Sequence, residues 1–172
     1  LYYYGNGVEK DLPQAFLWYQ RSSSQGQPYA AYSIAQMYRY GEYVTKDNDT
    51  AQRYYKQALS GFLKIESDDM ANDDLFYKLG QMFKFGLETD SDVTKAIEYF
   101  KRSAEMNNKN GFFEYGKALL TGEHIPQDTD SAVKLLEKAV KLKNSNAKRF
   151  LALEYISGEH LEQDIEKGIA LL

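Results

Sequence analysis

Apolar side chains recur along this chain at the three- and four-residue spacing of an amphipathic helix. One stripe comprises Ala30, Ile34, Ala35 and Tyr38. A second comprises Leu75, Leu79, Gly80 and Phe83. Each stripe is narrow and contains a small residue, Ala35 or Gly80, where a neighbouring helix can approach closely. The pattern predicts an all-α fold built from packed helices.

A glycine follows the predicted helices at a nearly constant interval. The set is Gly5, Gly41, Gly86, Gly122 and Gly158, with separations of 36, 45, 36 and 36 residues. Three positions before each glycine stands a large apolar residue: Tyr2, Tyr38, Phe83, Leu119 or Tyr155. Self-similarity at a fixed period is the signature of a repeat protein. Because glycine enters the left-handed conformation easily, we expect it to end the first helix of each repeat.

An aspartate stands six residues after each of these glycines. The set is Asp11, Asp47, Asp92, Asp128 and Asp164. A carboxylate at a helix start can accept hydrogen bonds from free backbone N–H groups, so each aspartate is predicted to begin a second helix. Pro13 is compatible with such a start. Small residues and bulky pairs further along, such as Ala15 and Trp18-Tyr19, are expected to face the first helix. Each repeat is therefore a helix–loop–helix.

The 45-residue interval has additional residues between the second helix of one repeat and the first helix of the next. Helical spacing of apolar side chains continues there through Ala58-Leu59, Phe62-Leu63 and Glu66. This favours a longer second helix that ends in an acidic turn at residues 67–69, and the alternative is an insertion loop. One array of repeats is thus predicted over residues 1–172. Its repeats lie roughly at 1–26, 27–61, 72–107, 108–143 and 144–172, with a helical insertion near 62–71.

These registers resemble the Sel1-like repeat family, relatives of the tetratricopeptide repeats. The resemblance rests on GNGVEKDLPQAFLWYQRS, Gly5 to Ser22, and on LGQMFKFGLETDSDVTKAIEYFKRSA, Leu79 to Ala104. It covers nearly the whole chain. One position departs from the family pattern: the second loop glycine is present as Gly7 and is replaced by Tyr43, Glu88, His124 and His160 in the later repeats.

The resemblance implies a right-handed α/α solenoid of antiparallel helix pairs, with about four to five repeats. The chain starts after the first helix of its first repeat and ends at Leu171-Leu172, inside a second helix. We therefore expect a fragment truncated at both ends, with a longer parent protein. Uncapped ends would expose apolar side chains, and end-to-end self-association is one expected consequence.

Composition narrows the possible functions. There is no cysteine, which excludes disulfides, thiolate metal sites and a cysteine nucleophile. The net charge of −4 disfavours nucleic-acid binding by this segment, and no apolar run is long enough to span a bilayer. Tyrosine is abundant, at 15 residues, and the repeat positions account for many of these.

Catalytic and metal-binding patterns are weak in this sequence. His124 and His160 occupy the same loop position one repeat apart, too far from each other to share a metal ion. The recurring aspartates also stand one per repeat, so they do not pair as catalytic carboxylates do. No phosphate-binding loop or hydrolase motif is present. We therefore predict no enzyme activity, no cofactor and no metal.

A partner surface is expected on the first helices of the repeats, on the side turned away from the second helices. The predicted binding residues are Tyr29, Tyr32, Gln36, Arg39, Tyr40, Tyr77, Gln81, Lys84, Phe85, Phe113, Lys117 and Arg149. Aromatic residues and arginine dominate many binding hot spots, and the lysines favour an extended peptide of acidic or aromatic character. The aromatic members have an alternative role, which is packing against a neighbouring repeat.

The sequence thus predicts a protein–protein interaction scaffold, or adaptor, for a peptide or protein partner, with no membrane contact. An accessory repeat region of a larger enzyme, for example a bacterial DNA-mobilisation protein, is the alternative. The scaffold hypothesis predicts that the chain acts by binding alone, and the accessory-region hypothesis predicts a catalytic domain elsewhere in the parent protein. The lack of cysteine and of a visible targeting signal favours the cytoplasm.

Overall fold

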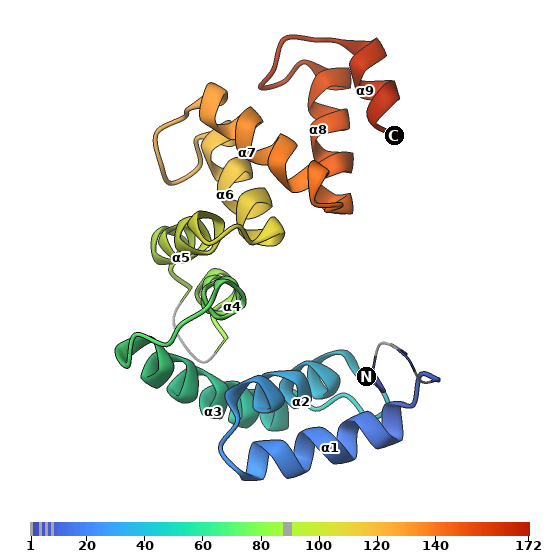
Figure 1. The fold of residues 1–172 in the computed structure, drawn as a ribbon, viewed down its shortest axis with the longest axis vertical. Coiled ribbons are helices and arrows are strands. Elements are labelled where there is room, and N and C mark those ends of the chain that lie inside the picture. Colours follow the sequence, from blue (N-terminus) through green and yellow to red (C-terminus); the bar gives the residue numbers. More distant parts are fainter. Residues whose placement is uncertain (1, 4, 6, 8, 88–90) are drawn as a thin grey trace. The chain divides into compact units, whose positions relative to one another are not determined.

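A computed structural model describes residues 2, 3, 5, 7, 9–87 and 91–172, and all regular secondary structure in these residues is α-helical (Figure 1). The helices are α1 (Leu12–Ser24), α2 (Pro28–Tyr40), α3 (Asn48–Ser67), α4 (Asp73–Phe85), α5 (Val93–Glu105), α6 (Lys109–Thr121), α7 (Thr129–Lys141), α8 (Ser145–Ser157) and α9 (Ile165–Leu171). The all-α prediction is confirmed.

The chain divides into two compact units. Unit 1 contains residues 1–71 and 86–90, and unit 2 contains residues 72–85 and 91–172. In unit 1, α2 packs against both α1 and α3. In unit 2, each helix from α4 to α9 packs against the next one along the chain. Figure 1 shows the pairs α2–α3 and α6–α7 side by side, each joined by a short loop. Consecutive helices are therefore spatial neighbours within each unit.

Helix α3 is longer than the other second helices. It has 20 residues, whereas α1, α5 and α7 have 13 each. Its added turns carry the fully buried Phe62, whose ring centroid lies 5.0 Å from that of Tyr29 in α2. The additional residues thus continue the helix to Ser67 and extend the core of unit 1, and they do not form a loop between Ala58 and Ser67.

The recurring aspartates cap the second helices as predicted. Asp11, Asp47, Asp92, Asp128 and Asp164 are the N-cap residues of α1, α3, α5, α7 and α9. In each case one carboxylate oxygen accepts a hydrogen bond from the backbone N–H three residues later, at 2.9–3.1 Å. These contacts satisfy N–H groups that have no partner inside the helix. Pro13 lies in the first turn of α1, where a missing N–H costs little.

The recurring glycines end the first helices. Gly41, Gly122 and Gly158 are the C-caps of α2, α6 and α8, with φ of 71°, 69° and 71°. This left-handed conformation lets the glycine N–H reach back to a carbonyl of the last turn. Two loop residues that replace the family's second glycine, Tyr43 and His124, also have positive φ, of 67° and 65°. Glu88, the corresponding residue of the third repeat, lies outside the described residues.

A main-chain hydrogen bond closes each repeat, which sequence reasoning did not anticipate. The N–H of each capping aspartate donates to a carbonyl nine residues earlier, at 2.8–3.0 Å. The acceptors belong to the large apolar residues of the repeat pattern: Tyr2, Tyr38, Phe83, Leu119 and Tyr155. The bond joins the last turn before the glycine to the cap of the next helix. It therefore fixes the loop between the two helices of a pair.

A second set of caps lies at the start of the first helices. Asn72, Asn108 and Asn144 recur at the 36-residue interval and precede α4, α6 and α8. The side chain of each accepts a hydrogen bond from the backbone N–H three residues later, at 2.8–3.1 Å. Asparagine is a favoured N-cap because its oxygen replaces the missing helical acceptor. Both helices of these repeats are therefore capped by side chains.

Small residues let the helices of a pair approach closely. Gly80 of α4 faces the Phe100 ring of α5, and a Cβ atom at Gly80 would lie 2.5 Å from the ring carbon Cε1. Ala15, Ala51, Ala96, Ala132 and Gly168 are all buried at the start of the second helices. The bulky pairs vary more, because Tyr99 and Phe100 are buried whereas Trp18 is 50% exposed. No first helix precedes α1 in the described residues, so the exposure of Trp18 leaves the expected orientation of that pair untested.

Candidate binding surface

Two of the predicted binding residues on α2 are part of the core of unit 1. Tyr32 is 6% exposed, and its ring centroid lies 5.5 Å from Tyr55 and 6.1 Å from Phe62. Tyr29 is half-buried and makes an edge contact with Phe62 at 5.0 Å. Aromatic pairs at these separations stabilise packing between helices. Both tyrosines therefore have a structural role, whatever part they take in binding.

The other predicted residues of α2 are more accessible. Gln36 and Arg39 are half-buried, and Tyr40 is 65% exposed. The guanidinium carbon of Arg39 lies 5.7 Å from the centre of the Tyr40 ring, within the range of a cation–π contact. Arg39 also lines a pocket of about 270 Å³ in unit 1, together with Gln52. This end of α2 presents an arginine and an aromatic ring to solvent.

Tyr77 and Gln81 lie one turn apart on α4 of unit 2. The Tyr77 ring centroid is 5.9 Å from that of Phe100, and the Gln81 side-chain nitrogen donates to the Tyr77 hydroxyl at 3.1 Å. Burial raises the pKa of Tyr77 to about 12, and the nearby carboxylate of Glu114 acts in the same direction. Tyr77 is thus a neutral, half-buried side chain at ordinary pH.

Lys84 is held between two helices at the end of α4. Its ammonium nitrogen lies 2.7 Å from a carboxylate oxygen of Glu114 on α6. The same nitrogen lies 5.6 Å from the centre of the Phe85 ring, which is 52% exposed. Lys84 therefore contacts both the largely buried carboxylate of Glu114 and the exposed ring of Phe85. Such a constrained cation has less conformational entropy to lose on binding than a free one.

Helices α6 and α8 contribute a further aromatic cluster. Phe113 contacts Phe150 edge to face, with 6.0 Å between the ring centroids. The ammonium group of Lys117 lies 5.5 Å from the centre of the Phe150 ring. No carboxylate among the described residues forms an ion pair with Lys117. Arg149, one residue before Phe150, is exposed.

A pocket of about 130 Å³ lies beside these side chains in unit 2. Lys84 and Lys117, both predicted from the sequence, line it together with Glu114. The α5 side of the pocket is apolar and consists of Val93, Ala96, Ile97 and Phe100. Ala118, Thr121, Glu123 and His124 complete the wall. The pocket thus combines an apolar side from α5 with two lysines and two glutamates.

We define the α4–α6 surface as Tyr77, Gln81, Lys84, Phe85, Phe113, Glu114 and Lys117. Six of these residues were predicted, and Glu114 was missed. Its signal in the sequence is its spacing of three residues before Lys117, which places both on one side of α6. Phe150 lies outside the predicted set, because Arg149 and not Phe150 stands nine residues before the helix-ending Gly158. Neither omission changes the side of the helices on which the surface lies.

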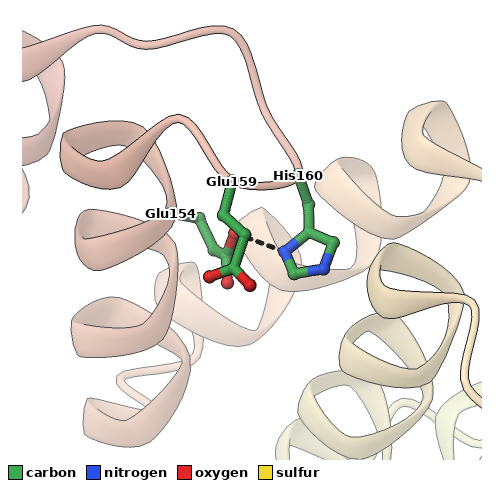
Figure 2. A group of neighbouring side chains, drawn as sticks. All are labelled: Glu154, Glu159 and His160. Atoms are coloured by element: carbon green, nitrogen blue, oxygen red, sulfur yellow. Dashed lines mark hydrogen bonds and ion pairs between the residues drawn. The ribbon is translucent and has the colours of Figure 1, made fainter.

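Three potential metal-ligand side chains meet at the end of α8 (Figure 2). Nδ1 of His160 lies 2.9 Å from a carboxylate oxygen of Glu154, and Glu159 approaches both, so that one ligand atom of each residue lies within 4.8 Å of the others. Glu154 is only 7% exposed. Sequence reasoning considered His160 with His124, whereas the neighbours of His160 come from its own repeat.

None of the helices in the described part of the chain is long and apolar enough to cross a membrane.

Comparison with known proteins identifies the repeat. The Sel1 repeat model matches residues 1–27, 28–61, 77–108, 113–144 and 145–172. Two curated relatives come from Arabidopsis thaliana: the ERAD-associated E3 ubiquitin-protein ligase components HRD3B, 40% identical over 58 residues, and HRD3A, 34% identical over 58 residues. Each match covers 34% of this chain, and about a tenth of the length of either relative.

Two solved structures resemble the whole chain. The Sel1 repeat protein from Oxalobacter formigenes aligns with a TM-score of 0.65 at 23% identity, over 99% of this chain and 66% of that one. The protective antigen c5321 of uropathogenic Escherichia coli, described as displaying an SLR fold, aligns with a TM-score of 0.63 at 27% identity, over 99% of this chain and 34% of that one. The first likeness shows the fold alone.

Proposed function

This chain belongs to the Sel1-repeat family, and on that premise we propose that it binds an extended peptide segment of another protein through the α4–α6 surface of unit 2. Sel1-repeat proteins are generally protein-interaction scaffolds, and they are typically non-catalytic.

The observation that carries the proposal is the pocket beside Lys84 and Lys117. Its volume of about 130 Å³ accommodates part of one side chain. Burial of carbon atoms against its apolar side is energetically favourable. The exposed ring of Phe85 stands next to Lys84 and can pack against a neighbouring residue of the same peptide. A central pocket with an aromatic neighbour is the common arrangement of a binding hot spot.

The charges favour an acidic residue in the peptide. Lys84 already pairs with Glu114, whereas Lys117 has an aromatic contact and no carboxylate partner among the described residues. A carboxylate at Lys117 gains a charge-assisted hydrogen bond without breaking an existing ion pair. The proposed ligand therefore combines an apolar or aromatic residue with Asp or Glu nearby in its sequence.

A peptide-display selection with the intact chain tests this proposal. Selected peptides are expected to contain an acidic residue near an apolar or aromatic one. Their affinities, measured by fluorescence anisotropy, should fall about tenfold or more in Lys117→Glu and in Phe85→Ala. Lys56→Glu is the matched control, because Lys56 is exposed on α3 of unit 1. Equal binding of the selected peptides to all three variants, each shown by circular dichroism to be folded, would refute the proposal.

A second function is favoured by the curated relatives, which are named as components of an E3 ubiquitin ligase. In this alternative the repeats are an accessory region that positions a catalytic partner or domain. Lys117→Glu in the parent protein would then slow turnover of a protein substrate, while a small-molecule activity of the catalytic part stays unchanged. If the protein is a scaffold alone, its own polypeptide has no catalytic activity to measure.

A further inference from the structure

The loop between α8 and α9 is fixed at both ends. Gly158 ends α8, and its N–H donates to the Glu154 carbonyl at 2.9 Å. At the other end, the Asp164 N–H donates to the Tyr155 carbonyl at 2.8 Å, and the Gln163 side chain donates to the Ile156 carbonyl at 2.9 Å. Side chains in the middle of this loop are therefore presented at defined positions. Two of them are Glu159 and His160.

Glu154 occupies a position that is apolar in the other repeats with a described first helix. Four residues before the helix-ending glycine, these repeats have Met37, Met82 and Ala118. In the last repeat this position holds a carboxylate with 7% exposure. A buried carboxylate is unfavourable unless a cation or strong donor compensates for its lost hydration. The compensating group is found among its neighbours: Nδ1 of His160 lies 2.9 Å from a Glu154 carboxylate oxygen.

The preceding repeat provides an internal comparison. Glu123 and His124 stand at the same loop positions as Glu159 and His160, directly after the helix-ending glycine. The residue that corresponds to Glu154 in this repeat is Ala118, and His124 is exposed. In the described residues, Glu154, Glu159 and His160 form a cluster of potential ligand side chains. The buried carboxylate is thus what turns an ordinary loop pair into a three-membered cluster.

We infer that Glu154, Glu159 and His160 form a binding site for a divalent cation of the Zn²⁺ class. One imidazole nitrogen and two carboxylate oxygens are a donor set that Zn²⁺ accepts, whereas Mg²⁺ and Ca²⁺ prefer oxygen atoms alone. Donors at about 2.1 Å around a tetrahedral Zn²⁺ stand roughly 3.4 Å apart. The three ligand atoms, all within 4.8 Å of one another, need only small side-chain rotations to reach this spacing.

Three protein ligands leave one tetrahedral position for water or for a side chain of a partner. The bound cation joins the last turn of α8 to the loop that leads to α9, because Glu154 belongs to the helix and the other two ligands to the loop (Figure 2). Its double positive charge also compensates the buried carboxylate of Glu154. This site goes beyond the proposed peptide-binding function and does not depend on it.

Isothermal titration calorimetry of the tag-free, chelator-treated chain tests this inference. We expect one equivalent of Zn²⁺ to bind and Mg²⁺ at the same concentration not to compete. His160→Asn and Glu159→Gln should weaken Zn²⁺ binding by at least about tenfold. His124→Asn is the matched control from the equivalent loop position, and it should bind Zn²⁺ as the unmodified chain does.

Glu154→Gln completes the set, with its folding checked by circular dichroism. Glu159→Gln guards against a folding artefact, because Glu159 is exposed and its substitution leaves the contact between Glu154 and His160 in place. The inference is overturned if no Zn²⁺ binds, or if the three ligand variants bind Zn²⁺ as tightly as His124→Asn. Either result would leave the cluster as an ion pair that fixes the loop.

Discussion

Asn144 joins the beginnings of two first helices in unit 2. Its side-chain oxygen accepts from the Ala147 N–H at 2.9 Å, and its amide nitrogen donates to the Lys109 carbonyl at 3.1 Å. Asn108 has the same arrangement one repeat earlier, where its side-chain amide donates to the Asp73 carboxylate at 2.9 Å. One residue type thus caps its own helix and ties it to the equivalent helix of the preceding repeat.

We expect Asn144→Ala to lower the free energy of unfolding by about 2–3 kcal/mol. The change removes an N-cap, worth about 1 kcal/mol, and two part-buried hydrogen bonds, from the Asn144 amide to the Lys109 carbonyl and to the Asn110 side chain, each worth about 0.5–1.5 kcal/mol. Urea denaturation measures the difference. Asn146→Ala, at an exposed position of the same turn, is the control and should change stability by less than about 0.5 kcal/mol. Similar losses in both variants would contradict this role of Asn144.

The aspartate caps make stability depend on acid pH. The hydrogen bond from the Ser131 side chain lowers the pKa of Asp128, and the one from Thr50 lowers the pKa of Asp47, both from an ordinary value of 3.8. A carboxyl group with a lowered pKa in the folded state contributes stability above its ordinary pKa. That contribution is lost as the pH falls through the folded-state value.

Asp128→Asn separates this charge effect from capping. Asparagine also caps helices, but it does not titrate. The melting temperature of the Asp128→Asn variant is therefore expected to fall less than that of the unmodified chain between about pH 5 and pH 2.5. This range spans the ordinary aspartate pKa. Thermal melts at a series of pH values provide the measurement. A steeper acid decline in Asp128→Asn would show that the cap is not a source of the pH dependence.

At the scale of elements, α4 and α5 pack tightly where Gly80 faces the Phe100 ring. A methyl group at this position would meet the edge of the Phe100 ring, which is itself buried. Alanine has the higher helix propensity, by about 1 kcal/mol, so an open helix position would be stabilised by this change. The direction of the effect therefore reports whether the two helices are in contact.

We expect Gly80→Ala to destabilise the chain by about 1–3 kcal/mol, the usual cost of overpacking a core. Phe100→Leu removes the clashing ring edge at a cost of its own. The double variant should lose less stability than the sum of the losses in the two single variants, because leucine leaves space for the new methyl group. Additive losses in urea denaturation would argue against a direct contact between the two positions.

Local signals in the sequence predicted the helix ends well. A capping aspartate or a helix-ending glycine acts through atoms within a few residues, and each signal recurs five times. The extent of α3 followed from the same local periodicity. The exposure of Trp18 and the burial of Tyr32 depend on which helix packs against them, which periodicity alone does not specify. The contact of Glu154 with His160 crosses a helix end, where no regular spacing applies.

At the scale of the whole molecule, the array expected from the sequence is divided into two compact units. The main segment of unit 1 ends at Ala71, shortly after the extension of α3, so this boundary falls in the irregular 45-residue interval. Regular 36-residue spacing holds throughout the glycines that follow. In repeat proteins cooperativity is transmitted through contacts between adjacent repeats. An interruption of the regular spacing is therefore a natural boundary for unfolding.

The two units are expected to unfold in separate transitions. Trp18 is the single tryptophan of the chain and belongs to unit 1, whereas circular dichroism reports on the helices of both units. Urea curves followed by tryptophan fluorescence and by circular dichroism should therefore have different midpoints, because coincident curves are the mark of a two-state transition. Superimposable curves would show that the chain unfolds as one cooperative body.

The main-chain bond that closes each repeat affects how such a chain can diversify. Its donor and acceptor are backbone groups, so substitution of Tyr155 or Leu119 by another apolar residue leaves it intact. The loop corner it encloses is free to change, and it carries a tyrosine in one repeat and a histidine in another. New recognition or metal chemistry can therefore arise in a single repeat while the helices on either side keep their places.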